Sequence, residues 1–196
     1  MKIVFFAISF VLAWLFTWLV KKIAWRFSIV DQPDGFRKVH NSPTPLLGGV
    51  AIWLTSSLLV IYLAFFTNLL IGRDISVRQI IGLLIAGSIL MLSGYLDDKY
   101  KIKPSQQIIS PIIAVVVIIL GGINVSSITN PLGGIINLNA IWPYLGTVIT
   151  FGWLLGIMYT TKLLDGLDGL ATGVGLIGSL IIFGLTQVTA FYQPSV

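Results

Sequence analysis

Four of the seven acidic residues lie where long apolar segments end. Asp97 and Asp98 follow one such segment, and Asp165 and Asp168 follow another. Carboxylates at the edge of a membrane segment are costly and usually functional. Their oxygens suit hard divalent cations such as Mg²⁺, which also binds phosphate oxygens. The two pairs therefore predict one hard-cation site that faces one side of a membrane.

The spacing of Asp165 and Asp168 favours a shared target. Positions i and i+3 lie on one face of a helix, so both carboxylates could point at one centre. Three neighbouring glycines, which let backbone or ligand come close, are Gly166, Gly169 and Gly173. The alternative is a glycine-rich helix exit whose acids are only solvated.

Asp97 and Asp98 stand at the C-terminal end of a predicted helix. A carboxylate there opposes the helix dipole by about 0.3–1 kcal/mol. Bound Mg²⁺ would offset this cost, and so would a solvated network of nearby lysines. Those lysines are Lys99, Lys101 and Lys103.

A basic cluster precedes the second apolar segment. Arg37, Lys38 and His40 lie in a loop that is rich in proline. An arginine fork holds phosphate through two hydrogen bonds. The next predicted helix begins at a glycine pair, and a helix N-terminus favours anions. The cluster predicts phosphate contacts, with simple anchoring of a cytoplasmic loop as the alternative.

The composition argues against a soluble globular protein. Hydrophobic residues make up 56% of the chain and charged residues 10%, and the mean hydropathy is +0.97. We expect an all-α polytopic membrane protein whose helices cross about 30 Å of hydrocarbon. The absence of cysteine excludes disulfides and thiolate metal sites. The six predicted spans are residues 3–20, 48–71, 79–96, 108–123, 141–164 and 174–191.

The segments between these spans predict a single membrane domain over residues 1–196. Residues 124–139 have turn residues between β-branched stretches, which indicates a small outer hairpin. An outside N-terminus would place nine of the twelve lysines and arginines on the inner side. The acidic pairs and the basic loop then face the cytoplasm. The pI near 9.6 reflects this orientation and gives no reason to expect a nucleic-acid partner.

Three motifs occur in order along the chain. They are D-x-P-x-x-x-R-K-x-H from Asp31, G-x-x-D-D from Gly94 and D-G-L-D-G-L-A-x-G from Asp165. With these motifs the chain resembles the polyprenyl-phosphate N-acetylhexosamine-1-phosphate transferases, the MraY/WecA/TagO group. The first motif is closer to the WecA/TagO branch. The resemblance covers essentially the whole chain.

The resemblance implies an enzyme of the plasma membrane with a cytoplasmic active face. A UDP-N-acetylhexosamine, with UDP-N-acetylglucosamine as the expected donor, gives its sugar 1-phosphate to polyprenyl (undecaprenyl) phosphate. UMP is released, Mg²⁺ is required, and the product serves cell-envelope polysaccharides such as lipopolysaccharide or teichoic acid. Family members have ten or eleven helices, so we expect this chain to be the N-terminal portion of a longer transferase. A homodimer is compatible with the sequence.

The residue roles follow from the chemistry of phosphoryl transfer. A phosphate monoester is mostly dianionic at pH 7, so positioning and charge neutralisation should matter more than a general base. We expect Asp97, Asp98 and Asp168 to be metal ligands or organisers, with Asp165 also catalytic. Activation of the nucleophile by Asp97 or Asp98 is the second choice.

Basic residues are expected to contact phosphate groups. The proposed contacts are Arg37, Lys38, His40, Lys103 and Lys162. Lys162, like Tyr159, stands where the family usually has asparagine, and it could contact a diphosphate oxygen. Ser105 or Gln107 stands where the family has a lysine, and Lys103 could replace that lysine from a shifted position.

Three other readings remain open. An intramembrane Mg²⁺-dependent prenyltransferase would also use aspartate pairs, but it would want a third acid after Asp165 and Asp168. A membrane transporter would place ionisable residues near the midplane, whereas the acids here cluster at one edge. The third is an inactive, truncated homologue.

Overall fold

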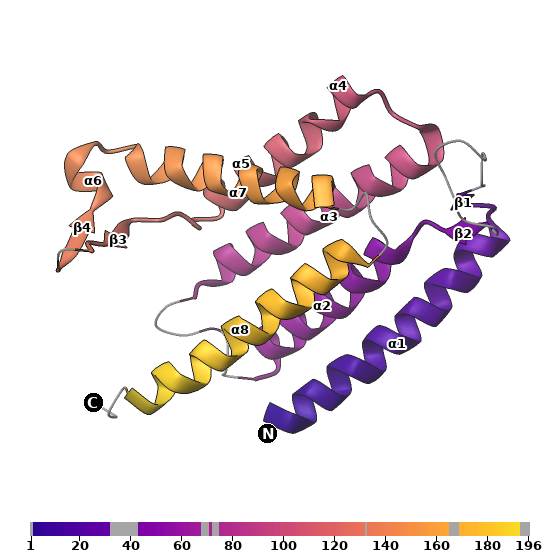
Figure 1. Cartoon of the computed structure of the whole chain (residues 1–196), viewed down its shortest axis with the longest axis horizontal. Coiled ribbons are helices and arrows are strands. Elements are labelled where there is room, and N and C mark those ends of the chain that lie inside the picture. The colour runs from indigo at the N-terminus through magenta and orange to yellow at the C-terminus, as the bar shows by residue number, and fades with distance from the viewer. Residues whose placement is uncertain are drawn as a thin grey trace. The chain divides into compact units, whose positions relative to one another are not determined.

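The computed structural model describes residues 2–31, 43–67, 71, 75–131, 133–164 and 169–192. Each of the six predicted spans contains a helix (Figure 1). The helices are α1 (Lys2–Arg26), α2 (Gly48–Phe65), α3 (Val77–Tyr100), α4 (Pro104–Gln107), α5 (Ile109–Leu120), α6 (Leu138–Ile141), α7 (Leu145–Leu164) and α8 (Leu170–Tyr192). The strands are β1 (Val30–Asp31), β2 (Thr44–Pro45), β3 (Ser127–Thr129) and β4 (Ile135–Asn137).

Four of these helices are long and apolar enough to cross a membrane. They are α1, α2, α3 and α7, whereas α4 with α5, and α8 over its residues Leu170–Leu185, are shorter apolar helices. The prediction of an all-α polytopic membrane protein is confirmed. Two of the six predicted spans are shorter in the described part of the chain than a full crossing requires.

Several helix ends differ from the predicted limits: the helix in the span predicted over 48–71, for example, ends at Phe65. Two helix starts differ for identifiable reasons. The span predicted from position 141 begins only at Leu145, because Trp142 precedes Pro143 and has an extended backbone, with φ −153°. The span predicted from position 79 begins at Val77. The Ser76 side chain accepts from the Gln79 N–H, and the Gln79 side chain accepts from the Ser76 N–H, so a capping box fixes this helix start.

The chain divides into two compact units, Met1–Phe151 and Gly152–Val196. The second contains the C-terminal part of α7 and all of α8. Over its described side chains α8 exposes large apolar groups, including Leu180 and Phe183, as a helix in lipid does. The single membrane domain over residues 1–196 stays a prediction.

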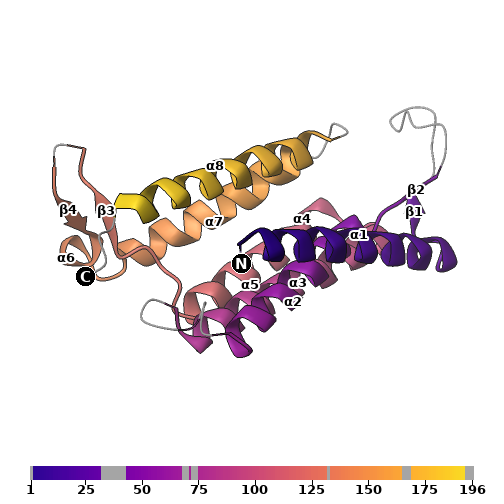
Figure 2. The ribbon, with the colours of Figure 1, turned by 90° about the horizontal axis from the view of Figure 1, so that it is seen from below.

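In the first unit α1, α2, α3 and α5 lie side by side, with each helix antiparallel to the next (Figures 1 and 2). A small core forms where α1 ends and α2 begins. Its buried members are Val20, Ala24, Ile29, Leu47 and Ala51. Tyr95 from α3 packs against this core, which therefore holds the end of α3 against α2.

Two short antiparallel pairings complete the first unit. Strands β3 and β4 pair Ile128 with Ile136, which confirms the predicted hairpin. The Thr150 hydroxyl accepts from the Val125 N–H at 2.9 Å, so the hairpin is anchored to α7. Strands β1 and β2 pair Asp31 with Thr44, which brings together the two ends of the first loop.

Candidate functional site

The candidate site lies at the end of the first unit where α3 finishes. Asp97 and Asp98 occupy the last turn of this helix, and the N-terminal end of α2 lies beside them. Consecutive residues on an α-helix point about 100° apart, since 3.6 residues make one turn. Asp97 therefore lies on the side of α4 and α5, where it is half-buried, whereas Asp98 is exposed and lines a groove beside α2.

Asp97 is held by a side chain from the next helix. The Gln107 amide donates from Nε2 to Asp97 Oδ1 at 2.8 Å and to the Ile102 carbonyl at 3.0 Å. Both donors of one amide nitrogen are thus engaged, which fixes the plane of the amide. A charge-assisted hydrogen bond of this kind is stronger than a neutral one.

A tight connection places Gln107 within reach of Asp97. Lys101 ends α3 in the left-handed conformation, with φ 49°, and its N–H donates to the Asp97 carbonyl at 2.8 Å. Lys103 precedes α4, whose first residue is Pro104, a residue suited to that position. The Lys103 carbonyl accepts from the Gln107 N–H at 3.2 Å. The chain therefore reverses over three residues and returns Gln107 to the end of α3.

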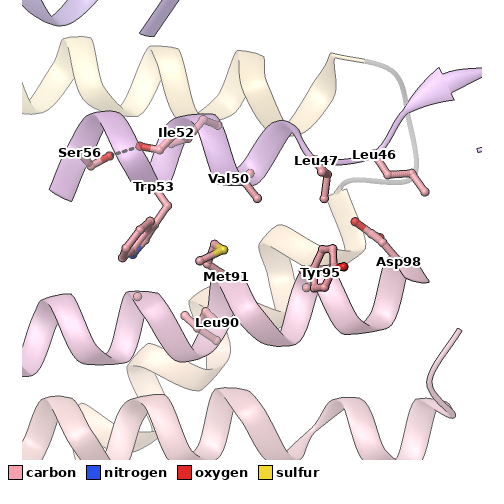
Figure 3. A pocket seen from close by; sticks show the side chains of 13 residues that line it. Leu46, Leu47, Val50, Ile52, Trp53, Ser56, Leu90, Met91, Tyr95 and Asp98 are labelled. Carbon is pink, nitrogen blue, oxygen red and sulfur yellow. Dashed lines mark hydrogen bonds between the residues drawn. The ribbon is translucent and has the colours of Figure 1, made fainter. Parts of the chain in front are cut away.

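The groove beside Asp98 has a volume of about 450 Å³. Apolar side chains of α2 and α3 line it, among them Val50, Trp53 and Met91, with Leu46 before α2. Figure 3 shows Trp53 facing Met91 across the groove, while Asp98 lies at the end next to Leu46. The groove thus runs between two membrane-spanning helices and has one carboxylate at its end. Such a groove could hold a ligand that has an apolar chain and either an anionic or a cation-bound head group.

A glycine shapes the far end of this groove. A Cβ at Gly87 would lie 2.8 Å from Trp53 Nε1, so the glycine lets the Trp53 indole approach α3 closely. At the other end, Gly94 has open space around it. Lys99 Nζ donates to the Tyr95 hydroxyl at 3.4 Å and lies 5.7 Å from the centre of that ring. The Lys99 ammonium group is thus close to Tyr95, which lines the groove next to Asp98.

The other predicted site residues are either exposed on the surface or outside the described part of the chain. Lys103 is exposed at the start of α4, and Lys162 is exposed in the last turn of α7, in the second unit. Five predicted residues lie outside the described part of the chain: Arg37, Lys38, His40, Asp165 and Asp168. The β1–β2 pairing does bracket the segment that holds the first three.

The described residues supply part of a metal site. No group of three or more histidine, cysteine, aspartate or glutamate side chains gathers among them. Asp97 and Asp98 have the hard oxygen donors that Mg²⁺ prefers, and Mg²⁺ is commonly bound through one or two carboxylates plus substrate phosphates and water. The donor set therefore fits a cation that is shared with a phosphorylated substrate.

No sequence motif assigns a role to Gln107 or to the groove. Gln107 is notable in the sequence only because it, or Ser105, stands where the family has a lysine. A signal for its contact does exist, because a proline-started turn after Lys103 brings the chain back toward Asp97. No sequence pattern indicates the groove, because the apolar residues that line it are of the same types as those that face lipid.

The site and fold define a polytopic membrane protein with carboxylates at the edge of one span. Residues 80–194, more than half of the chain, match glycosyl transferase family 4. The chain belongs to this family.

Several curated proteins are similar to the chain. A probable undecaprenyl-phosphate N-acetylglucosaminyl 1-phosphate transferase of Bacillus subtilis is 27% identical over 90% of the chain and 46% of that relative. A decaprenyl-phosphate N-acetylglucosaminephosphotransferase of Mycolicibacterium smegmatis is 30% identical over 95% of the chain and 47% of the relative. An undecaprenyl-phosphate alpha-N-acetylglucosaminyl 1-phosphate transferase of Salmonella typhi is 25% identical over 68% and 36%.

The chain spans about half the length of these curated relatives, 46% of the first and 47% of the second. No solved structure gives a significant match. The family is therefore established from sequence, and the activity of the protein is a separate question.

Proposed function

We propose that this chain forms all or part of an enzyme that transfers N-acetylglucosamine 1-phosphate from UDP-N-acetylglucosamine to polyprenyl phosphate. Membership of glycosyl transferase family 4 and the names of the relatives support the reaction class. The single observation that carries the proposal is Asp98 at the end of an apolar groove between two membrane-spanning helices. A lipid phosphate needs such a combination of apolar walls and a polar, cation-binding end.

The reaction forms one P–O bond and breaks another. An oxygen of the acceptor phosphate attacks the sugar-linked phosphorus of the donor, and the bond from that phosphorus to the bridging oxygen breaks to release UMP. The acceptor is mostly dianionic at pH 7, so little is gained from a general base. The main difficulty is bringing two anions together, and charge neutralisation and positioning must supply most of the rate enhancement. Mg²⁺, when bound, would supply that neutralising charge at the diphosphate oxygens.

The proposed roles divide between the two faces of α3. Asp98 would hold the cation at the mouth of the groove, and Asp97, fixed by Gln107, would hold it from the side of α4. The prenyl chain of the acceptor would lie along the apolar walls, next to Trp53 and Met91. Lys103 is a proposed contact of the donor phosphates from the start of α4.

The residues outside the described part keep the roles that the sequence suggested. Asp165 and Asp168 are proposed to organise Mg²⁺ and diphosphate, and Arg37, Lys38 and His40 to contact phosphate. Lys162 is proposed as a further phosphate contact. The proposed setting is the bilayer of the plasma membrane with the active face cytoplasmic, and a homodimer is compatible with these roles.

The test is a transfer assay on membranes that contain the protein. UDP-N-acetylglucosamine with a radiolabelled sugar, undecaprenyl phosphate and Mg²⁺ are supplied, and labelled lipid and UMP are measured. Asp98→Asn and Asp168→Asn should each lower the rate at least about 100-fold, because each removes a charge that acts mainly in the transition state. Asp74→Asn, at the acid predicted to face the opposite side, is the matched control.

Two results would contradict the proposal. Membranes with the unaltered protein that form no labelled lipid above the level of membranes without it would refute the reaction. Full Mg²⁺-dependent activity of both aspartate variants would refute the metal assignment while leaving the reaction in place.

A further inference from the structure

We propose that Gln107 is a positioning residue for the transfer reaction, which fixes the Asp97 carboxylate so that a divalent cation is held through Oδ2. The inference rests on the proposed function. It assigns a role to a residue that would otherwise be an ordinary polar side chain on a short helix. The observation behind it is the paired contact of one amide nitrogen with Asp97 Oδ1 and the Ile102 carbonyl.

The surroundings of Gln107 distinguish it from the neighbouring glutamine on α4. Gln107 and Asp97 are both half-buried, so their contact is partly shielded from water. Gln106, the preceding residue on α4, is exposed. The two glutamines differ in their surroundings but share a helix of four residues, which makes Gln106 a matched control.

The electrostatics explain why Asp97 needs a partner. Its carboxylate is next to Asp98 in the chain and lies at the C-terminal end of a helix, where the dipole opposes a negative charge. Both effects favour rotation of the side chain toward solvent. A donor at 2.8 Å offsets them and keeps one rotamer, without bringing a positive charge that would compete with a cation.

The second contact ties this arrangement to the backbone. The Ile102 carbonyl lies between Lys101 and Lys103, in the three-residue turn that follows α3. The Gln107 amide is therefore anchored to the turn as well as to the carboxylate. Hydrogen-bonded partners of metal ligands orient those ligands, and their loss commonly reduces metal affinity or activity by about 10–100-fold.

The experiment uses the purified protein in lipid nanodiscs and compares Gln107→Met with Gln106→Met. Methionine keeps the length of the side chain and removes the donor. Mn²⁺ is the probe, titrated alone and followed by electron paramagnetic resonance, and transfer kinetics and thermal unfolding are measured in parallel. Gln107→Met should weaken Mn²⁺ binding by about 10-fold or more and lower kcat by a similar factor. KM for the nucleotide sugar and the unfolding temperature should match those of Gln106→Met.

The dependence on Asp97 is tested by a double-mutant cycle. In an Asp97→Ala background, Gln107→Met should cause no further loss of Mn²⁺ affinity, because its effect acts through that carboxylate. Gln107→Leu is the second variant, which also lacks a donor and adds neither charge nor a cation ligand. It should weaken Mn²⁺ binding by about the same factor as Gln107→Met.

The outcomes separate this inference from the proposed function. Equal Mn²⁺ affinity in the Gln107 and Gln106 variants, additive losses in the cycle, or no Mn²⁺ binding by the unaltered protein would each overturn the positioning role. Mn²⁺ binding that depends on Gln107 in a protein without transferase activity would support the positioning of Asp97 and refute the proposed reaction.

Discussion

The two sides of α3 are packed in opposite ways. Toward α5 the contact is close along its length, with Gly82 against Gly121 and Ala114 and Val115 fully buried. Toward α2 the same helix leaves a groove of about 450 Å³. One helix therefore provides both a fixed support and an open surface for a ligand.

Hydrogen bonds reinforce the close side at both ends. At the start of α3, Arg78 Nη2 donates to the Leu120 carbonyl at 2.7 Å, and Gln79 Nε2 donates to the Gly122 carbonyl at 3.2 Å. At the other end, Ser93 donates to Ser110 at 2.6 Å, one turn before Asp97. Small residues let helices approach closely in lipid, and polar side chains then bind across the interface.

This difference shows why Asp97 and Asp98 are not equivalent. Asp97 belongs to the supported side, where Gln107 binds one of its carboxylate oxygens, and Asp98 belongs to the open side, where it lines the groove. Substitutions that add volume on one side of α3 and leave the other side unchanged test this difference.

The largest effect is expected from a methyl group added on the close side. A Cβ at Gly82 would lie 3.0 Å from the Gly121 Cα, so Gly82→Ala must move the two backbones apart. We expect a loss of about 1–3 kcal/mol in the free energy of unfolding. Gly94→Ala, on the same helix but in open space, should be neutral or stabilise by about 0.5–1 kcal/mol.

Unfolding in a denaturant titration measures both variants. Similar losses in the free energy of unfolding for Gly82→Ala and Gly94→Ala would show that the two sides of α3 are packed alike. That result would contradict the difference in packing described above.

A smaller effect is expected from filling the groove. Met91→Trp places a large ring between the walls, and it should raise KM for the lipid acceptor about tenfold, equivalent to about 1.4 kcal/mol. KM for the nucleotide sugar should not change. Val116→Trp, at an exposed position on α5, makes a comparable change of volume away from the groove. An unchanged acceptor KM in Met91→Trp would show that the prenyl chain does not use this groove.

The smallest effect is expected at the serine pair. Ser110→Ala removes the hydrogen bond to Ser93, and interhelical hydrogen bonds in membranes average about 0.6 kcal/mol. A double-mutant cycle with Ser93→Ala, followed by thermal unfolding, gives the coupling. The rate of transfer should stay within about twofold of the unaltered protein, because the pair supports α3 and touches no substrate. Loss of activity without loss of stability would place the serines in the site itself.

The span pattern could be predicted from sequence because it follows from composition and length. Runs of apolar residues predicted the six longer helices but not the short helices α4 and α6, and the β-branched stretches around the turn predicted the hairpin. Their ends were harder, because a capping box at Ser76 and the backbone before Pro143 depend on local geometry. The pairing of β1 with β2 was not predicted, because strands of two residues are too short to show an alternating pattern in the sequence.

The candidate site could be predicted only as a set of residue types. Motif spacing identified Asp97 and Asp98 as one unit with one role. Their surroundings differ because the two side chains point in different directions from α3, one toward α4 and the other toward α2. A sequence motif does not show which helices pack on each side. The same reason hid Gln107, whose contact with Asp97 spans ten residues and depends on the left-handed turn at Lys101.

The order of residues along the chain already defines the class of this protein: a helical membrane protein with carboxylates at the edge of its spans, in glycosyl transferase family 4. These properties are local, since they depend on which residues follow one another. The three-dimensional arrangement of the helices was needed to show that α3 is tightly packed on one side and open on the other. It was also needed to show that Gln107 binds Asp97 while Asp98 lines a groove. Packing sets those properties, because they depend on contacts between segments that are distant in the chain.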